Sequence, residues 1–263
     1  MKIIVLVKQV PDTTEVKLDP KTGSLVREGV ESIINPDDRH ALEAALHLKE
    51  TRGGEITVLS MGPPQAIDAV SEAMGMGVDR GILLCDQAFA GADTWATSST
   101  LGKAIEKLGD FDLVICGRQA IDGDTAQIGP QVAEYLNLPQ VTYVVDMEGV
   151  KKRTLVVKRR VEQGFERIEC RLPALLTVID ALNEPRYPTV AGLIEACMEK
   201  APIKVWDAAD IGVQAGEVGL AGSLTQVIKT FAPKLQREGE ILQGDIQESV
   251  ATLVDRLREN RLI

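Results

Sequence analysis

The chain has 263 residues, of which 44% are hydrophobic, and a formal net charge of −10. This length allows one or two domains with a sizeable core. The acidic balance argues against nucleic acid or an anionic membrane as the main partner, and an aromatic content of 3% leaves little for base stacking. No apolar run is long enough to span a bilayer and no cleavable signal begins the chain, so we expect a cytoplasmic protein without membrane insertion.

The first half of the chain alternates strand-like and helix-like segments. Apolar runs typical of strands buried on both faces lie at residues 3–7, 55–60, 82–85 and 113–116. Helical spacing follows each run, over residues 36–48, 65–74, 94–108 and 128–136, with Asn35 and Asp93 as expected caps. Residues 16–29 predict a surface hairpin. The alternation predicts an α/β fold with a doubly wound parallel sheet and right-handed crossovers.

A doubly wound sheet that reverses after its third unit makes the first and fourth strands neighbours. Ligands in such sheets bind outside the carboxyl ends of the strands at this switch point. We therefore expect the loops at residues 8–11 and 117–125 to face each other. Met61, at the end of the second strand, would line one side.

The stretch 112–130, DLVICGRQAIDGDTAQIGP, has the order strand, glycine-containing loop and helix start. This order can present backbone N–H groups to a phosphate, although an ordinary strand-to-helix connection reads the same way. The acidic pairs Asp37/Asp38 and Asp122/Asp124 sit at expected helix starts, where capping explains them without catalysis.

Motifs for covalent or acid–base chemistry are missing from the sequence. It contains no GxGxxG after a strand, no GxxxxGK[ST], no GxSxG and no HExxH. The sequence favours a binder of a nucleotide-containing cofactor, and we assign no catalytic residue.

Metal binding is not expected either. The histidines, His40 and His47, lie seven residues apart on one predicted helix with no further ligand nearby. The cysteines are widely separated, with no CxxC pair, and we expect reduced and mostly buried thiols: Cys85, Cys116, Cys170 and Cys197.

From residue 141 the strand-like runs follow one another without helices. Runs at 141–147, 154–160, 166–171 and 175–179 predict antiparallel hairpins that extend the same sheet. Cationic clusters at 151–153 and 158–160 fit either solvated edge residues or a subunit or cofactor contact.

The last third is punctuated by proline and glycine, with a helical turn expected at 193–197 and little regular structure at 214–222. Residues 246–257 predict an amphipathic helix, which could dock on another subunit or fold back. We place the nucleotide-binding domain with its antiparallel extension at 1–185, and a partner-recognition loop with a loose C-terminal arm at 186–263.

The segments VKRRVEQGFERIECRLPALLTV (157–178) and LNEPRY (182–187) resemble the β subunit of electron transfer flavoproteins. VKQVPD (7–12), Asn35-Pro36, Gly62-Pro63 and GRQAIDGDTAQIGP (117–130) stand in the order of that family, so the resemblance covers essentially the whole chain. It implies an adenine-nucleotide hydrolase-like α/β fold and an α subunit that carries another FAD.

The resemblance also implies a set of cofactor-binding residues. Carried over residue by residue, it falls on Leu6, Asn35, Asp37, Asp38, Met61, Gly117, Arg118, Gln119, Ala120, Ile121, Asp122, Gly123, Asp124, Thr125, Ala126, Gln127 and Ile128. Thr94 and Thr97, at a helix start on the same side, are added as flavin contacts.

The nucleotide implied is FAD in bifurcating members of the family and a structural AMP in single-flavin members. The loop IDGDTAQIGP looks like the bifurcating type. Small Gly123 and Ala126 leave room, and Thr125 and Gln127 can donate hydrogen bonds to pyrophosphate or flavin. Asp122 and Asp124 are expected to cap the helix or to contact hydroxyl and ring N–H groups.

The function implied is electron transfer without acid–base catalysis of the subunit's own. NADH would reduce FAD held between this subunit and its α partner. The electrons would divide between a low-potential acceptor, ferredoxin or flavodoxin, and the α-subunit FAD, which feeds a partner flavoprotein dehydrogenase of acyl-CoA type. The residues implied to grip that partner are Tyr187, Thr189, Val190 and Leu193, with Val190 or Leu193 either an exposed anchor or a core residue.

Two alternatives remain beside this reading. One is a single-flavin electron transfer flavoprotein β subunit that holds AMP. The other is a stand-alone adenine-nucleotide-binding regulatory protein on the same fold. An adenylating enzyme is disfavoured because an SGGxDS-type pyrophosphate loop is missing.

Overall fold

The computed structural model describes residues 1–12, 31–229, 239 and 241–263. The hairpin expected at 16–29 lies outside the described residues. Contacts divide the chain into two compact units, Met1–Val227 and Ile228–Ile263, which are described separately.

The described strands are β1 (Lys2–Val7), β2 (Gln9–Pro11), β3 (Ser32–Ile34), β4 (Glu55–Met61), β5 (Arg80–Leu84), β6 (Leu113–Gly117), β7 (Gln140–Lys151), β8 (Thr154–Val161), β9 (Gly164–Arg171), β10 (Ala174–Val178) and β11 (Ile203–Trp206). The described helices are α1 (Pro36–Arg52), α2 (Ile67–Met76), α3 (Thr94–Leu108), α4 (Ile128–Tyr135), α5 (Val190–Ala196), α6 (Gly219–Gly222) and α7 (Ile246–Glu259), with 3-10 turns η1 (Pro64–Ala66), η2 (Gln87–Phe89) and η3 (Asp180–Leu182).

One large sheet organises the first unit. Its strand order in the described part of the chain is β11-β5-β4-β1-β6-β10-β7-β8-β9. β1 pairs in parallel with β4 on one side and with β6 on the other. The predicted switch point between the first and fourth strands of the alternating half is therefore confirmed.

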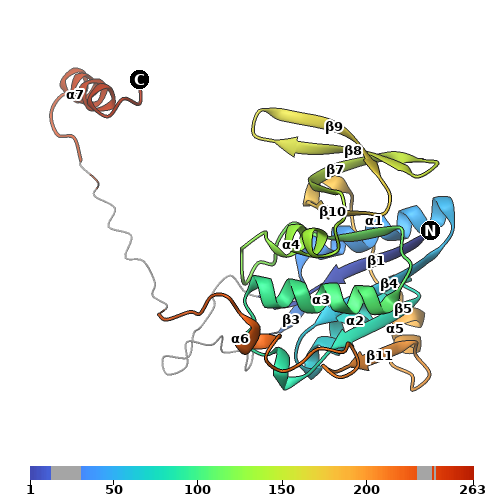
Figure 1. The fold of residues 1–263 in the computed structure, drawn as a ribbon. Helices are drawn as coiled ribbons and strands as arrows, with labels where there is room; N and C mark the ends of the chain where they lie inside the picture. The colour runs from blue at the N-terminus through green and yellow to red at the C-terminus, as the bar shows by residue number, and fades with distance from the viewer. Residues whose placement is uncertain (13–30, 230–238, 240) are drawn as a thin grey trace. The chain divides into compact units, whose positions relative to one another are not determined.

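Alternating side chains of the central strands fill two cores. Ile3 and Val5 pack into the core under α1 and α2, whereas Ile4 and Leu6 pack into the core under α3 and α4. Figure 1 shows α3 across the near face of the sheet and α1 behind it. A strand buried on both faces needs apolar residues at every position, which explains the unbroken run in β1.

The antiparallel extension is confirmed for β7, β8 and β9, which pair as consecutive antiparallel neighbours. β10 differs from the prediction, because it lies between β6 and β7 and runs parallel to both. Its five residues, ALLTV, are all buried. Such burial is typical of a central parallel strand and explains the difference.

The cationic clusters have local partners on this extension. Lys158 Nζ lies 4.4 Å from the centre of the Phe165 ring, and Arg159 donates a hydrogen bond to the Thr142 hydroxyl at 3.1 Å. Arg153 donates to the carbonyl of Leu172 at 3.4 Å. β8, which carries Lys158 and Arg159, pairs with both β7 and β9, so these two residues do not lie on an edge strand of the described sheet.

The first unit continues past residue 185. β11 extends the sheet beside β5, and α5 packs against α2. Residues 186–227, which the sequence analysis placed in the second region, thus belong to the α/β unit. The sequence around β11 contains no local pattern that predicts its pairing with β5, which lies more than a hundred residues earlier.

The second unit contains the predicted amphipathic helix, α7. Asp245 caps it by accepting a hydrogen bond from the N–H of Glu248 at 2.9 Å. Its apolar residues Ile246, Val250 and Leu253 are exposed. No helix in the described residues is long and apolar enough to cross a membrane.

Candidate functional site

A cleft of about 720 Å³ opens at the carboxyl ends of β1 and β6, where the sheet reverses. Leu6, Leu59, Phe89 and Leu101 give it an apolar inner wall, and the loop after β6 forms its polar rim. Both the position and the volume are those of a small-molecule site in a doubly wound sheet.

Most of the predicted cofactor-binding residues line this cleft. They are Leu6, Asp38, Met61, Thr94, Thr97, Gly117, Arg118, Gln119, Ala120, Gly123, Asp124, Thr125, Ala126, Gln127 and Ile128. Asn35, Asp37, Ile121 and Asp122 are not among the lining residues.

Asn35 holds the loop from behind. Its side chain is fully buried, donates to the carbonyl of Gln119 at 2.8 Å and accepts from the N–H of Ile121 at 3.0 Å. The residue occupies the N-cap position of α1, but its side chain makes no capping hydrogen bond. The expected side-chain cap is therefore wrong, since both polar groups of the amide serve the loop.

Asp38 joins the ends of the two central strands. Its carboxylate accepts from the N–H of Lys8 at 2.8 Å and from the N–H of Gly117 at 2.9 Å. A Cβ at Gly117 would overlap this carboxylate, so the close approach requires glycine. Burial raises the pKa of Asp38 to about 7, although both backbone hydrogen bonds oppose the shift.

Asp37 lies beside this clamp without lining the cleft. Burial raises the pKa of its carboxyl above the usual value, while Arg118, with Nε 3.5 Å from Asp37 Oδ2, acts in the opposite direction. Arg118 also lies 5.8 Å from the centre of the Tyr143 ring. Arg118, the first residue after β6, thus contacts both the start of α1 and β7.

The acidic residues of the loop have partners other than the helix. Asp122 pairs with Lys8, with Nζ to Oδ1 and Oδ2 distances of 2.6 and 2.8 Å, and Asp124 accepts a hydrogen bond from Gln119. Gln127 is the N-cap of α4, with no capping bond from its side chain. The first alternative, that Asp122 and Asp124 cap this helix, is therefore wrong, and the second, that they contact hydroxyl and ring N–H groups of a ligand, stays a prediction.

Two non-glycine residues of the loop have a left-handed backbone: Asp124 with φ 51° and Ala126 with φ 53°. Such residues cost free energy and cluster at ligand-binding loops. Gly123 does not have this conformation. A Cβ at Gly123 would meet no atom within 4 Å, so the rim is open there.

The start of α3 is tied to the opposite wall of the cleft. The Thr94 hydroxyl donates to Gln127 Oε1 at 3.0 Å and accepts from Gln131 Nε2 at 3.3 Å. Ser98 donates to Gln131 at 3.0 Å. Thr94 thus both lines the cleft and fixes the first turns of α3 and α4 to each other.

Several lining residues were absent from the sequence prediction: Val7, Lys8, Leu59, Phe89, Gly91, Ala92, Asp93, Leu101, Cys116, Gly129, Thr225 and Val227. Lys8 directly follows β1, and this position at the carboxyl end of a central strand could have predicted that it lines the cleft. Thr225 and Val227 lie about a hundred residues after the loop and carry no such signal.

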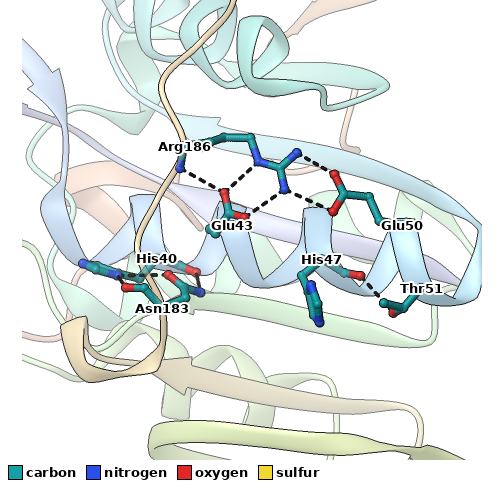
Figure 2. A network of polar contacts seen from close by, with 7 residues as sticks. All are labelled: His40, Glu43, His47, Glu50, Thr51, Asn183 and Arg186. Atoms are coloured by element: carbon teal, nitrogen blue, oxygen red, sulfur yellow. Dashed lines mark hydrogen bonds and ion pairs between the residues drawn. The ribbon is translucent and has the colours of Figure 1, made fainter.

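The two histidines of α1 have different surroundings. His40 Nδ1 lies 2.9 Å from the carbonyl of Asn183, and Asn183 donates back to the carbonyl of His40 at 3.0 Å (Figure 2). His47 is exposed. Among the residues that the structure describes, no group of three or more His, Cys, Asp or Glu could hold a metal ion.

The thiols follow the prediction in part. Cys116 and Cys170 are buried and Cys85 is intermediate, whereas Cys197 is exposed. Burial raises the pKa of the Cys116 thiol well above its usual value, with a smaller contribution from the charge of Asp38. A thiol that stays protonated next to the cleft supplies apolar surface and no nucleophile.

The segment expected to grip a partner begins at an ion-pair fork (Figure 2). Arg186 bonds Glu43 at 2.8 Å and Glu50 at 2.6 Å, and both acids lie on α1. Tyr187 and Val190, 87% and 75% exposed, follow the fork. Thr189 instead caps α5 by accepting from the N–H of Gly192 at 3.0 Å.

Leu193 differs from the other residues of this segment. It packs on α2, where a Cβ at Gly75 would lie 2.7 Å from Leu193 Cδ2. Its side chain is half-buried. Leu193 therefore holds α5 in place, whereas Val190 and Ile194, 75% and 56% exposed, are large apolar residues that α5 exposes.

The cleft fits an adenine nucleotide. The apolar wall can hold a planar ring, and first-turn N–H groups of α4 together with the Lys8 ammonium can meet phosphates. The open rim at Gly123 leaves room for a longer ligand. These features fit a nucleotide cofactor.

Comparison with known proteins agrees with this geometry. The family model "Electron transfer flavoprotein domain" matches residues 22–211. The chain is 54% identical to an electron transfer flavoprotein subunit beta of Thermoanaerobacterium thermosaccharolyticum and 50% identical to the caffeyl-CoA reductase-Etf complex subunit CarD of Acetobacterium woodii, with 100% of both chains covered in each case. It is 45% identical to the protein FixA of Azorhizobium caulinodans, over 90% of this chain and 86% of that one. The chain belongs to the electron transfer flavoprotein family, on the side of its β subunits.

Proposed function

We propose that this chain is the β subunit of a bifurcating, heterodimeric electron transfer flavoprotein and that its own nucleotide is FAD. With the α subunit, it takes electrons from NADH and divides them between a low-potential acceptor, ferredoxin or flavodoxin, and the α-subunit FAD. That second FAD feeds a partner dehydrogenase of acyl-CoA type.

The observation that carries the choice of FAD is the cleft at the switch point with its open rim. The cleft volume, about 720 Å³, is in the upper half of the roughly 300–1,000 Å³ typical of small-molecule sites. Gly123 and Ala126 add little bulk along the rim, which supports a dinucleotide over the smaller AMP.

The chain's residues have separate tasks in this proposal. Lys8 meets phosphate oxygens together with backbone N–H groups at the start of α4. Thr125 and Gln127 donate hydrogen bonds from the rim, and the apolar wall excludes water from the ring. FAD, when bound, would accept two electrons and pass them on one at a time.

The names of the relatives support a partner of acyl-CoA type. One relative, at 50% identity, is named as a subunit of a caffeyl-CoA reductase-Etf complex, and another, at 45%, as the electron transfer subunit gamma of acryloyl-CoA reductase in Anaerotignum propionicum. We extend this substrate class to the partner of the present chain. Family membership also favours an electron carrier over a stand-alone nucleotide-binding regulator.

Nucleotide extraction tests the proposal. The chain is co-expressed with its α subunit, the complex is purified, and the nucleotides released on denaturation are separated and quantified. We expect two FAD and no AMP per heterodimer. One FAD with one AMP would establish the single-flavin type, and a stable monomer that binds ATP without an α subunit would overturn electron transfer.

A further inference from the structure

One side chain outside the loop after β6 connects a late segment of the chain to the cleft. Asp93 Oδ2 accepts from both the N–H and the hydroxyl of Thr225, at 2.9 and 3.0 Å. The N–H of Asp93 donates to the Ser223 hydroxyl at 2.8 Å. We call residues 223–227 the strap.

The strap forms part of the mouth of the cleft. Thr225 and Val227 line it together with Asp93 and Thr94. Val227 is 79% exposed and the neighbouring Leu224 is 77% exposed, so apolar burial contributes little to holding the strap. The hydrogen bonds to Asp93 therefore make a large contribution to its position.

The base of the strap is firmly attached. In α6, directly before it, Gly219 has φ 58° and lies so close to the 88–90 segment that a Cβ would overlap the carbonyl of Ala88. The N–H of Leu220 donates to the carbonyl of Ala90 at 2.9 Å. A fixed base and a tip held mainly by polar contacts make a segment that can open without loss of the core.

Asp93 is also placed to join the two walls of the cleft. Its Oδ1 accepts from the N–H of Ala96 at 2.9 Å and so caps α3. The next residue, Thr94, bonds Gln127 in the opposite wall. The start of α3 thus contacts the strap through Asp93 and the loop after β6 through Thr94.

We propose that Asp93 is a positioning residue that holds the strap across the cleft mouth and thereby slows release of the bound nucleotide. This role rests on the proposed nucleotide site. Hydrogen bonds to an ionised carboxylate are stronger than neutral ones, and closure by a short segment commonly sets the rate of ligand release.

The substitution Asp93→Asn removes the contact of Asp93 with the strap but keeps its role as the N-cap of α3. Asn is as good an N-cap as Asp, so its oxygen can keep the bond to Ala96, but its amide N–H₂ cannot accept from the N–H of Thr225. Asp86→Asn is the matched control. Asp86 Oδ1 accepts from Ala88 at 2.9 Å and its Oδ2 from Ala208 at 3.1 Å, and Asp86 does not line the cleft.

Both variants are examined as full-length chains in the complex with the α subunit, loaded with FAD and separately with AMP. The release rate is followed after a chase with labelled nucleotide, and hydrogen exchange is followed at the amides of 223–227 and 96–98. We expect release to be about tenfold faster in Asp93→Asn, with faster exchange in the strap only. Asp86→Asn should release at the wild-type rate. Thr225→Val, which removes the hydroxyl but keeps the N–H, should give a smaller increase.

Faster strap exchange with unchanged release would overturn the proposal. Faster exchange at 96–98 with an unchanged strap would assign the effect to the cap and would also overturn it. A wild-type complex that holds neither FAD nor AMP would overturn both the proposed function and the role of Asp93. If the complex holds nucleotide and Asp93→Asn releases it at the wild-type rate, only the role of Asp93 is overturned.

Discussion

The Lys8 ammonium lies 2.6 Å from the Asp122 carboxylate and joins the loop after β1 to the loop after β6. The Asp122 side chain is 6% exposed, whereas that of Lys8 is 43% exposed. The pair places a buried anion behind the rim and leaves part of the cation facing the cleft. This arrangement gives a site in an acidic protein a local positive group for phosphate.

Lys8→Gln should weaken both the loop and the nucleotide site. The variant leaves the Asp122 carboxylate without its cation, so we expect about 1–2 kcal/mol lower stability and roughly tenfold weaker binding of AMP or FAD. Urea unfolding and equilibrium dialysis measure the two effects. Lys103→Gln removes a solvent-screened pair with Glu106 and a contact with the Tyr135 ring, and it should change stability much less than Lys8→Gln does. Equal effects of the two substitutions would contradict a role of Lys8 in the site.

Asp38 should make stability depend on pH near neutrality. Its folded pKa, about 7, is above the ordinary 3.8, so the folded chain holds a proton that the unfolded chain has released. The stabilising contribution is complete below about pH 4 and is lost as the pH rises through about 7, by at most about 1.4 kcal/mol per unit. Denaturant unfolding of wild type and Asp38→Asn at about pH 5 and pH 8 measures it. A stability difference between the two proteins that does not change with pH would show that Asp38 stays ionised.

Gly123→Leu should exclude the nucleotide while the fold stays intact. The Cβ of the new side chain would meet no protein atom within 4 Å, and Gly123 lines the cleft, so the added bulk would take space at the rim. Co-purified nucleotide should fall to a small fraction of the wild-type amount, with unchanged circular dichroism. Gly216→Leu is the control, because Gly216 also has no neighbour within 4 Å and does not line the cleft. Wild-type nucleotide content in Gly123→Leu would remove Gly123 from the site.

Arg186→Gln should loosen the segment that leads to α5. Burial by itself would raise the pKa of Glu43, but its hydrogen bonds and charge interaction with Arg186 outweigh burial and lower it. The resulting stabilisation, about 1 kcal/mol after allowance for solvent, is present above the ordinary pKa of 4.5 and is lost as the pH falls through the lower folded value. Unfolding at neutral and acidic pH tests this. Arg167→Gln, at the exposed pair with Glu148, should have a smaller effect.

Val190 and Leu193 should separate docking from stability. Val190→Asp places a charge on the exposed face of α5, so we expect about tenfold weaker coupling to the partner dehydrogenase with unchanged nucleotide content. Leu193→Ala removes packing on α2 and should lower stability by about 2 kcal/mol. Steady-state electron transfer and thermal unfolding distinguish the two. Unchanged electron transfer in Val190→Asp would argue against docking through this face.

The sequence by itself determined the elements whose signals are local. The apolar runs of β1, β4, β5 and β6 fix buried parallel strands, and their alternation with helices places the switch point between β1 and β6. The loop after β6 could be predicted as part of a binding site because it contains glycines and follows the end of that strand. Most of the cleft rim could therefore be predicted from residues that are adjacent in the chain.

Only the tertiary structure decided the contacts between distant segments. Composition gave no sign that β10 inserts between β6 and β7, because a buried apolar run does not specify its neighbours. Asn35, Asp38 and Asp122 looked like helix caps, and their roles changed once the folded chain brought backbone N–H groups and Lys8 within hydrogen-bond distance. Capping is a local interaction and can be anticipated from spacing, whereas a hydrogen bond across eighty or a hundred residues depends on the packing of the whole sheet.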